Sequence, residues 1–232
     1  MFVTIAFVSP RREPVSRRNR PTKAPLSRAG VVGLAFRIMR EEGLERVTMR
    51  RLATELDTGP ASLYVYVRNT AELHGALLDE LLAELVLPGI ETPAGWRDRL
   101  IDLLCRYTEL LYGYPSLARS VLTLMPSGPR YLRLIDTILG LLHDGGVASR
   151  PAAWGVNVLL AHAVASAAEH GTRDESISGA EEFETLATVA REAPAERYPH
   201  LDRVRDELMS GTGEDRMRWS FEVLLRGIET IS

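Results

Sequence analysis

Apolar side chains recur at helical intervals from Ser27 onward. Five of them fall on one face of a helix at spacings of three and four residues: Val31, Leu34, Ala35, Ile38 and Met39. Ser27 is suited to begin this helix, because its hydroxyl can accept a bond from the free N–H groups of the first turn. Gly43 is suited to end it, since glycine adopts the left-handed backbone of a C-terminal stop. The pattern predicts a first helix between these two residues.

Residues 48–73 predict two short helices joined by a tight turn. Thr48 is the expected N-cap of the first, and residues 57–59, Asp-Thr-Gly, tolerate turn geometry. Pro60 then opens the second helix, where its missing N–H costs nothing, and this helix is expected to run to about Val67. The second helix presents small hydroxyl and aromatic side chains, a layout suited to a helix that enters the DNA major groove.

The rest of the chain predicts only helices. Asn69 and Glu72 resemble a capping box that opens a longer helix to about Val86, and a Pro- and Gly-rich linker follows at 87–95. Further helices are expected at 95–113, 116–124, 129–144, 150–170, 181–193 and 215–231, with polar connections at 171–179 and 194–213. No segment alternates with a period of two, so the sequence predicts an all-α fold.

Composition places the chain among globular proteins of one large domain, or of a small domain and a larger one. No uninterrupted apolar run approaches the ~18 residues of a membrane helix. The apolar start MFVTIAFV precedes its basic cluster, which is the wrong order for a secretory signal, and we therefore expect a cytoplasmic protein without a membrane partner. Cys105 is the single cysteine, which excludes a disulfide framework and a cysteine metal site.

Charge is distributed unevenly along the chain. Residues 1–70 hold 13 Arg and Lys against 6 Asp and Glu, a net charge of +7, whereas the remainder holds 15 against 25, a net charge of −10. A basic first part and an acidic second part are typical of a DNA-binding module attached to one that does not touch DNA.

Residues 1–25 combine four prolines with six basic residues and show no periodicity, which predicts a disordered basic arm. Two interpretations remain open for it. The arm either contacts DNA phosphates or the minor groove, or it is an unstructured extension without that role.

A spaced set of residues in the predicted helix-turn-helix resembles the TetR family of bacterial repressors: Gly43, Thr48, Arg50-x-Leu52-Ala53, Leu63-Tyr64 and Asn69-x-x-Glu72-Leu73. The second part resembles the tetracycline-repressor subgroup of that family through Trp96 with Arg99-Leu100, Tyr114-Pro115, Ser127-Gly128-Pro129 and the closing FEVLLRGIE. Together these matches extend from about residue 26 to residue 231.

The resemblance implies a three-helix DNA-binding head at 26–72 and a larger helical effector-binding and dimerisation body at 73–232. It also implies a homodimer that binds a palindromic operator in double-stranded DNA. Asp57 stands where the family commonly has glycine. Because Asp tolerates the left-handed backbone, we expect a normal turn.

The resemblance also implies which residues of the head contact DNA: Thr48, Arg50, Pro60, Ala61, Ser62, Tyr64, Tyr66 and Thr70. Arg50 is expected to lie over a phosphate or to reach a guanine edge, for which its guanidinium fork is suited; the alternative is a solvated arginine. Tyr64 is expected to bond a phosphate, with a core role as the alternative. Tyr66 diverges from it by about 200° on a helix and cannot share its face.

A hydrophobic small-molecule effector is the second implied partner. Positions that match the family's pocket are Leu103, Tyr107, Val121, Leu124, Met125 and Thr137, and Trp154 and His162 on the helix 150–170 are added as candidates. For each of these residues plain core or dimer packing is the alternative. Val86 and Val121 match the histidines with which the tetracycline repressor recognises its drug and magnesium. We therefore expect no magnesium-tetracycline binding, no metal and no cofactor.

The sequence thus predicts a ligand-responsive transcriptional regulator, a repressor by family resemblance, that a hydrophobic small molecule releases from its operator. An enzyme is disfavoured because the histidines show no metal spacing such as HExxH and no nucleophile–base pair is apparent. The alternative is a helical binding module that binds no operator, which salt-dependent, sequence-specific DNA binding would exclude.

Overall fold

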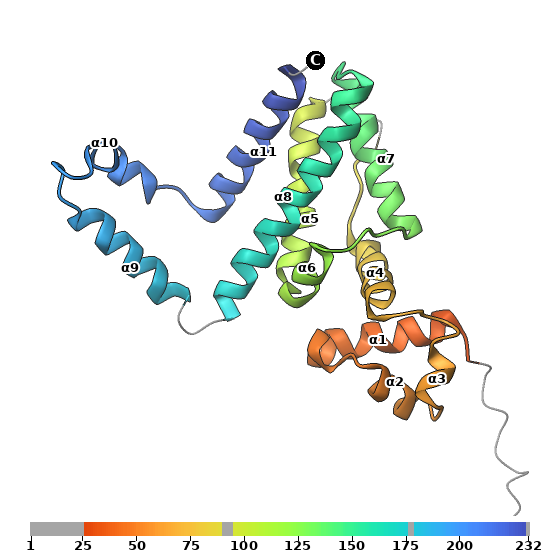
Figure 1. Ribbon diagram of the computed structural model, residues 1–232. Coiled ribbons are helices and arrows are strands. Elements are labelled where there is room, and N and C mark those ends of the chain that lie inside the picture. Colours follow the sequence, from red (N-terminus) through yellow and green to blue (C-terminus); the bar gives the residue numbers. More distant parts are fainter. Residues whose placement is uncertain (1–25, 90–94, 176–178, 231–232) are drawn as a thin grey trace, which may run out of the picture.

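The computed structural model describes residues 26–89, 95–175 and 179–230, so the predicted arm at 1–25 lies outside the described residues. Helices and no strands occur in these ranges, which confirms the all-α fold (Figure 1). They are α1 (Arg28–Glu42), α2 (Met49–Glu55), α3 (Pro60–Leu63), α4 (Thr70–Leu81), α5 (Trp96–Tyr112), α6 (Pro115–Val121), α7 (Pro129–Asp144), α8 (Ser149–Glu175), α9 (Gly179–Glu192), α10 (Pro199–Leu208) and α11 (Gly213–Thr230). Short 3₁₀ turns, η2 (Leu44–Arg46) and η3 (Leu82–Glu84), follow α1 and α4.

The head consists of α1, α2 and α3 and lies at the lower end of the molecule in Figure 1. Its predicted caps are confirmed: the Ser27 hydroxyl accepts from the N–H of Gly30 and the Thr48 hydroxyl from that of Arg51, both at 3.1 Å. Gly43 ends α1 with a φ of 93°. The small head core contains Ile38, Leu52, Leu63, Val67 and Leu73, all at most 1% exposed.

The turn between α2 and α3 is formed as expected. Asp57 has a φ of 49°, the left-handed conformation that a glycine would otherwise supply. The N–H of Thr58 bonds the carbonyl of Ala53 at 2.9 Å and closes the end of α2. Asp57 therefore adopts the left-handed conformation that this turn requires.

Two details of the head differ from the prediction. Helix α3 ends at Leu63 instead of Val67, because the N–H of Tyr66 bonds the Leu63 carbonyl, three residues before it, and tightens the chain into a turn. Only half of the capping box forms. The Asn69 side chain accepts from the N–H of Glu72 at 2.8 Å, but the Glu72 carboxylate bonds the N–H of Arg68 at 2.9 Å instead of that of Asn69.

The body surrounds α8, which packs against α5, α6, α7 and α11. Predicted and observed helices agree within three residues for α5, α6, α7 and α11. Helix α8 continues to Glu175, so the expected polar connection is shorter, and α10 occupies part of the connection expected at 194–213. Helix α10 has Leu201, Val204 and Leu208 at helical spacing, but none of its residues is buried.

The span Ser149–Gly171 within α8 is long and apolar enough to cross a membrane by length and composition alone. Asn157 and His162 interrupt the apolar sequence of this span, so it contains no uninterrupted apolar run of membrane-spanning length. Half of the span is buried within the structure, against the four helices that surround it. It is thus placed as the core helix of the bundle.

Helices α9 and α10 form a helical pair that extends away from the bundle (Figure 1). Helix α4 connects the head to the body and contacts α1 on one side and α6 and α7 on the other. Any change in the angle of α4 therefore changes the position of the head relative to the body.

Candidate DNA interface and effector site

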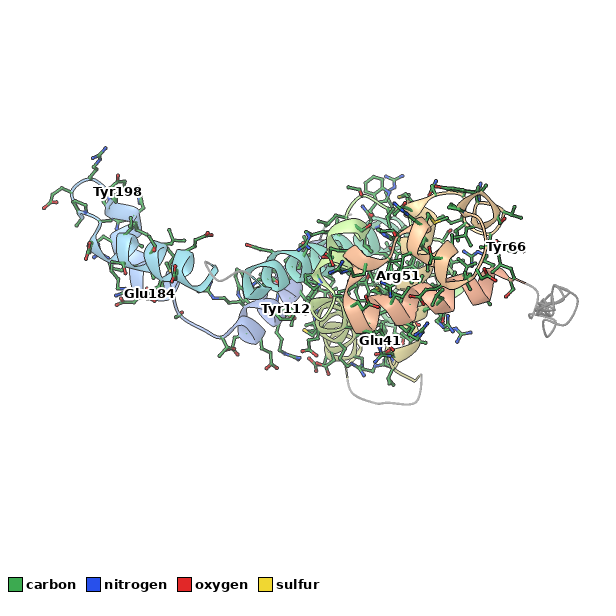
Figure 2. The ribbon with its side chains drawn as sticks, turned by 90° about the horizontal axis from the view of Figure 1, so that it is seen from below. Glu41, Arg51, Tyr66, Tyr112, Glu184 and Tyr198 are labelled. Carbon is green, nitrogen blue, oxygen red and sulfur yellow. The ribbon has the colours of Figure 1, made fainter. Side chains whose placement is uncertain are left out.

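The predicted recognition surface is exposed. Figure 2 views the head from below, with Arg51 near its centre and Tyr66 at its outer edge. Of the eight predicted DNA residues, Tyr66 is half-buried. The other seven are exposed to solvent: Thr48, Arg50, Pro60, Ala61, Ser62, Tyr64 and Thr70. Leu63 and Val67 point into the head core and hold the surface in place.

Arg50 and Arg51 have opposite environments. Arg51 bonds Glu55 at 2.6 Å and Glu42 at 2.8 Å, and these carboxylates raise its pKa. Among the described residues, no carboxylate lies within ion-pair distance of the exposed Arg50 guanidinium. The two neighbouring arginines therefore have different roles. Arg51 connects α2 to α1 through its ion pairs, whereas Arg50 is available to bind a phosphate or a base edge.

Sequence reasoning missed one candidate cation, Arg68. Its side chain is 89% exposed and lies 3.3 Å from Glu72, in a solvent-accessible pair that contributes little to stability. It follows the recognition helix and precedes Thr70, the first residue of α4. The first-turn N–H groups of α4 offer a second anion position beside it. An arginine directly after the recognition helix was the signal in the sequence.

The structure does not bring the eight predicted effector residues into one cavity. Leu103, Tyr107 and Val121 are buried in the body, and the half-buried Thr137 on α7 bonds the Arg133 carbonyl. Leu124 and the 95% exposed Met125 line a cleft of about 740 Å³ between head and body. Trp154 is 70% exposed on α8, and His162 lines a separate cavity.

Tyr107 is the clearest polar anomaly of the body. Its side chain is fully buried on α5, and its hydroxyl has no hydrogen-bond partner among the described residues. Burial raises the pKa of this phenol, which remains protonated. An unpaired buried hydroxyl costs roughly 1–3 kcal/mol. A polar group of a bound molecule next to Tyr107 would recover that cost.

A cavity of about 570 Å³ lies between α5, α8 and the start of α11, and it has the size of a small-molecule site. The Ser220 hydroxyl bonds the Met217 carbonyl at 2.7 Å and also lies 2.6 Å from His162 Nε2. When the hydroxyl proton is donated to the carbonyl, the Ser220 oxygen accepts from Nε2 of a neutral His162, and Nδ1 is then an acceptor. Burial lowers the pKa of His162 and favours this neutral form.

An exposed helix-turn-helix on a larger helical body with ligand-sized cavities defines a ligand-responsive, DNA-binding transcriptional regulator. The chain belongs to the TetR family: residues 32–77 match the model of bacterial regulatory proteins of the tetR family, and residues 87–232 match the tetracyclin repressor-like C-terminal domain. Members of this family are transcriptional regulators and not enzymes.

Similar proteins include several from Streptomyces. SCO7704 from Streptomyces coelicolor is 47% identical, with a TM-score of 0.77 over 90% of this chain and 98% of its own. ActR from the same species, solved with actinorhodin, is 29% identical, with a TM-score of 0.77 over 89% and 96%. The transcriptional repressor DrrR1 of Streptomyces coeruleorubidus is 27% identical over 93% of this chain and 82% of its own.

Proposed function

We propose that this regulator is a cytoplasmic homodimeric repressor that leaves a palindromic operator when a hydrophobic small molecule binds its body. Residues 26–72 serve as the DNA-binding head and residues 73–232 as the effector-binding and dimerisation body. The observation that carries the proposal is the exposed Arg50, which has no ion-pair partner among the described residues and lies beside a recognition helix whose outward side chains are small. The repressor DrrR1 among its relatives supports repression, as opposed to activation, as the mode of regulation.

Exposed apolar side chains on α8 and α11 support the homodimer. Trp154 and Val158 are four residues apart on α8, and Trp219 and Val223 repeat this spacing on α11. A β-carbon on Gly155 would lie 2.8 Å from Ile228, so the two helices are in close contact. Exposed apolar stripes of this kind mark interaction sites. Two such helices from each chain would form a four-helix interface.

Trp219→Glu is expected to convert the dimer into a folded monomer. The side chain is 69% exposed in the single chain, so the charge disturbs the interface without entering the core. Sedimentation velocity at micromolar concentration measures the change. Leu132→Glu, on the exposed surface of α7, is the matched control and is expected to remain dimeric. A Trp219→Glu protein that stays dimeric would contradict this interface.

Two heads on a two-fold axis require an operator with two inverted half-sites, roughly 34–36 Å apart. The experiment that tests the proposed function is a selection of genomic DNA fragments by the purified protein at physiological salt. We expect one palindromic motif upstream of a small set of genes. If no motif is enriched while the protein is folded, the alternative of a helical binding module without an operator is favoured.

The effector is proposed to be a hydrophobic or amphipathic molecule with at least one polar group. ActR has been solved with actinorhodin and with (S)-DNPA, which supports a small-molecule effector. Within this body, the two candidate positions are the cavity around His162 and the Tyr107 hydroxyl, which has no partner among the described residues. In our proposal binding shifts the body between two arrangements, α4 swings, and the two heads no longer fit both half-sites. The shift is limited by the effector's difference in affinity for the two arrangements.

A further inference from the structure

Asp79 on α4 is a buried carboxylate that reaches across to the body. The residue is 7% exposed, and its Oδ1 accepts from the N–H groups of Arg130 at 2.9 Å and Tyr131 at 3.0 Å. Both N–H groups belong to the first turn of α7, where no partner within the helix is available. The negative charge also suits the positive end of the α7 dipole. One side chain of α4 therefore caps a helix of the body.

Gly128, the residue before α7, fits against this carboxylate. A β-carbon on Gly128 would lie 2.1 Å from Asp79 Oδ1, far inside van der Waals contact. The φ of Gly128 is −70°, which any residue adopts, so space and not backbone conformation requires glycine here. The start of α7 and the Asp79 side chain are thus in direct contact.

Two serines on one face of helix α6 contact residues of α4 and η2, on the side of the molecule that faces the head. His74 on α4 lies 2.6 Å from the Ser120 hydroxyl through its Nδ1. Ser116, one turn earlier on α6, bonds the Glu45 carboxylate of η2. Together with Asp79 these contacts fix both ends of the α6–α7 connection, which includes Met125 of the interdomain cleft.

We infer that Asp79 is a positioning residue of this regulator: by capping α7 it fixes the angle of α4, and hence of the DNA-binding head, relative to the body. A buried carboxylate released from these bonds would be desolvated and unpaired, which is costly. Small displacements of the head are therefore resisted until the cap breaks. The expected effect on operator affinity rests on the proposed function, whereas the expected effect on the position of the head does not.

The cap and the ion pair at this site are separable. Arg130 is 3.5 Å from Asp79 Oδ2 and 3.4 Å from Glu80, and its side chain is 40% exposed, so solvent screens this pair. Asp79→Asn keeps an oxygen for both N–H groups and loses the charge. Arg130→Gln removes the ion pair and keeps the backbone cap. Asp79→Ala removes the cap, and Gly128→Ala displaces it while the carboxylate is retained.

The head position is measured in full-length protein by the distance between spin labels on Val65→Cys and Gly140→Cys. Val65 is 81% exposed on the head, and a β-carbon on Gly140 meets no atom within 4 Å. Burial raises the pKa of the Cys105 thiol to about 11, so this native cysteine is poorly reactive toward the label. Dilution with unlabelled protein isolates the distance within one chain.

We expect one narrow distance for the wild type, Asp79→Asn and Arg130→Gln, and a broadened or shifted distance for Asp79→Ala and Gly128→Ala. In parallel, affinity for the selected operator is expected to fall roughly 3- to 30-fold in the latter two, with affinity for unrelated DNA unchanged. If Asp79→Ala lowers the melting temperature but keeps the wild-type distance, Asp79 only stabilises the fold and the inference is refuted. Because the distance is measured without DNA, failure to bind an operator leaves this test intact.

Discussion

Arg50→Ala is expected to weaken binding to the selected operator by roughly 5- to 150-fold, the effect of losing about 1–3 kcal/mol from a good arginine contact. The guanidinium is exposed on α2, and among the described residues it has no carboxylate partner to give up on binding DNA. Its removal leaves the head core unchanged, because Leu52 and Ala53 supply the buried face of α2. Fluorescence anisotropy of a labelled operator at fixed salt measures the loss.

The control for Arg50→Ala is Arg133→Ala, which makes the same charge change on the exposed surface of α7. We expect it to bind the operator like the wild type. A series of operator variants separates the two possible roles of Arg50: loss of discrimination at one base pair indicates a guanine contact, whereas uniform weakening with a smaller salt dependence indicates a phosphate contact. Wild-type affinity in Arg50→Ala would show that α2 does not face the DNA.

Phe221→Ala is expected to destabilise the protein by about 3–5 kcal/mol, the usual cost of removing a fully buried aromatic side chain. Phe221 is 0% exposed on α11, and its ring meets His162 of α8 edge to face at a centroid distance of 5.2 Å. The cavity left behind would separate the two helices that carry the proposed dimer interface. Chemical denaturation at one fixed protein concentration measures the free energy of unfolding, since dimers unfold with a concentration-dependent midpoint.

Leu132→Ala is the matched control for Phe221→Ala. Leu132 is also apolar, but more than half of its side chain is exposed on α7, so its removal is expected to change stability by less than about 0.5 kcal/mol. A loss of stability in Phe221→Ala no larger than that of the control would show that α11 is not packed on α8 as described.

The head was predictable because its signals are local. Caps at Ser27 and Thr48, the stop at Gly43 and the turn at Asp57 depend on residues within four positions of one another, and all four formed. The early end of α3 depended on the bond from the Tyr66 N–H to the Leu63 carbonyl, which the pattern of side chains does not predict. Helix α10 was predicted as a connection although Leu201, Val204 and Leu208 have helical spacing, and none of its residues is buried.

The effector residues were less predictable because a pocket depends on how distant helices meet. Leu103, Tyr107 and Val121 have the apolar pattern of core residues, and pattern alone does not distinguish a cavity wall from a packed core. Trp154 lies on the helix that also carries His162, yet it faces outward where an interface is proposed. The unpaired Tyr107 hydroxyl and the cap formed by Asp79 required the three-dimensional structure.

The distribution of charge in the sequence likewise does not show which individual cations are available to DNA. The basic first part of the sequence indicated a DNA-binding module, but it could not distinguish Arg50 from Arg51. Glu42 and Glu55 form ion pairs with Arg51, whereas Arg50 is exposed. Net charge identifies the module, whereas pairing in the fold identifies which cations remain for DNA.

The most direct test of the central claim is the affinity of the wild-type protein for its selected palindrome relative to a scrambled duplex of the same length, measured by fluorescence anisotropy at physiological salt. Sequence-specific regulators bind their sites at least about 10³-fold more tightly than unrelated DNA, and we expect a ratio of that order or larger with one dimer per palindrome. Equal affinity for the two duplexes would contradict the claim that the head reads a DNA sequence.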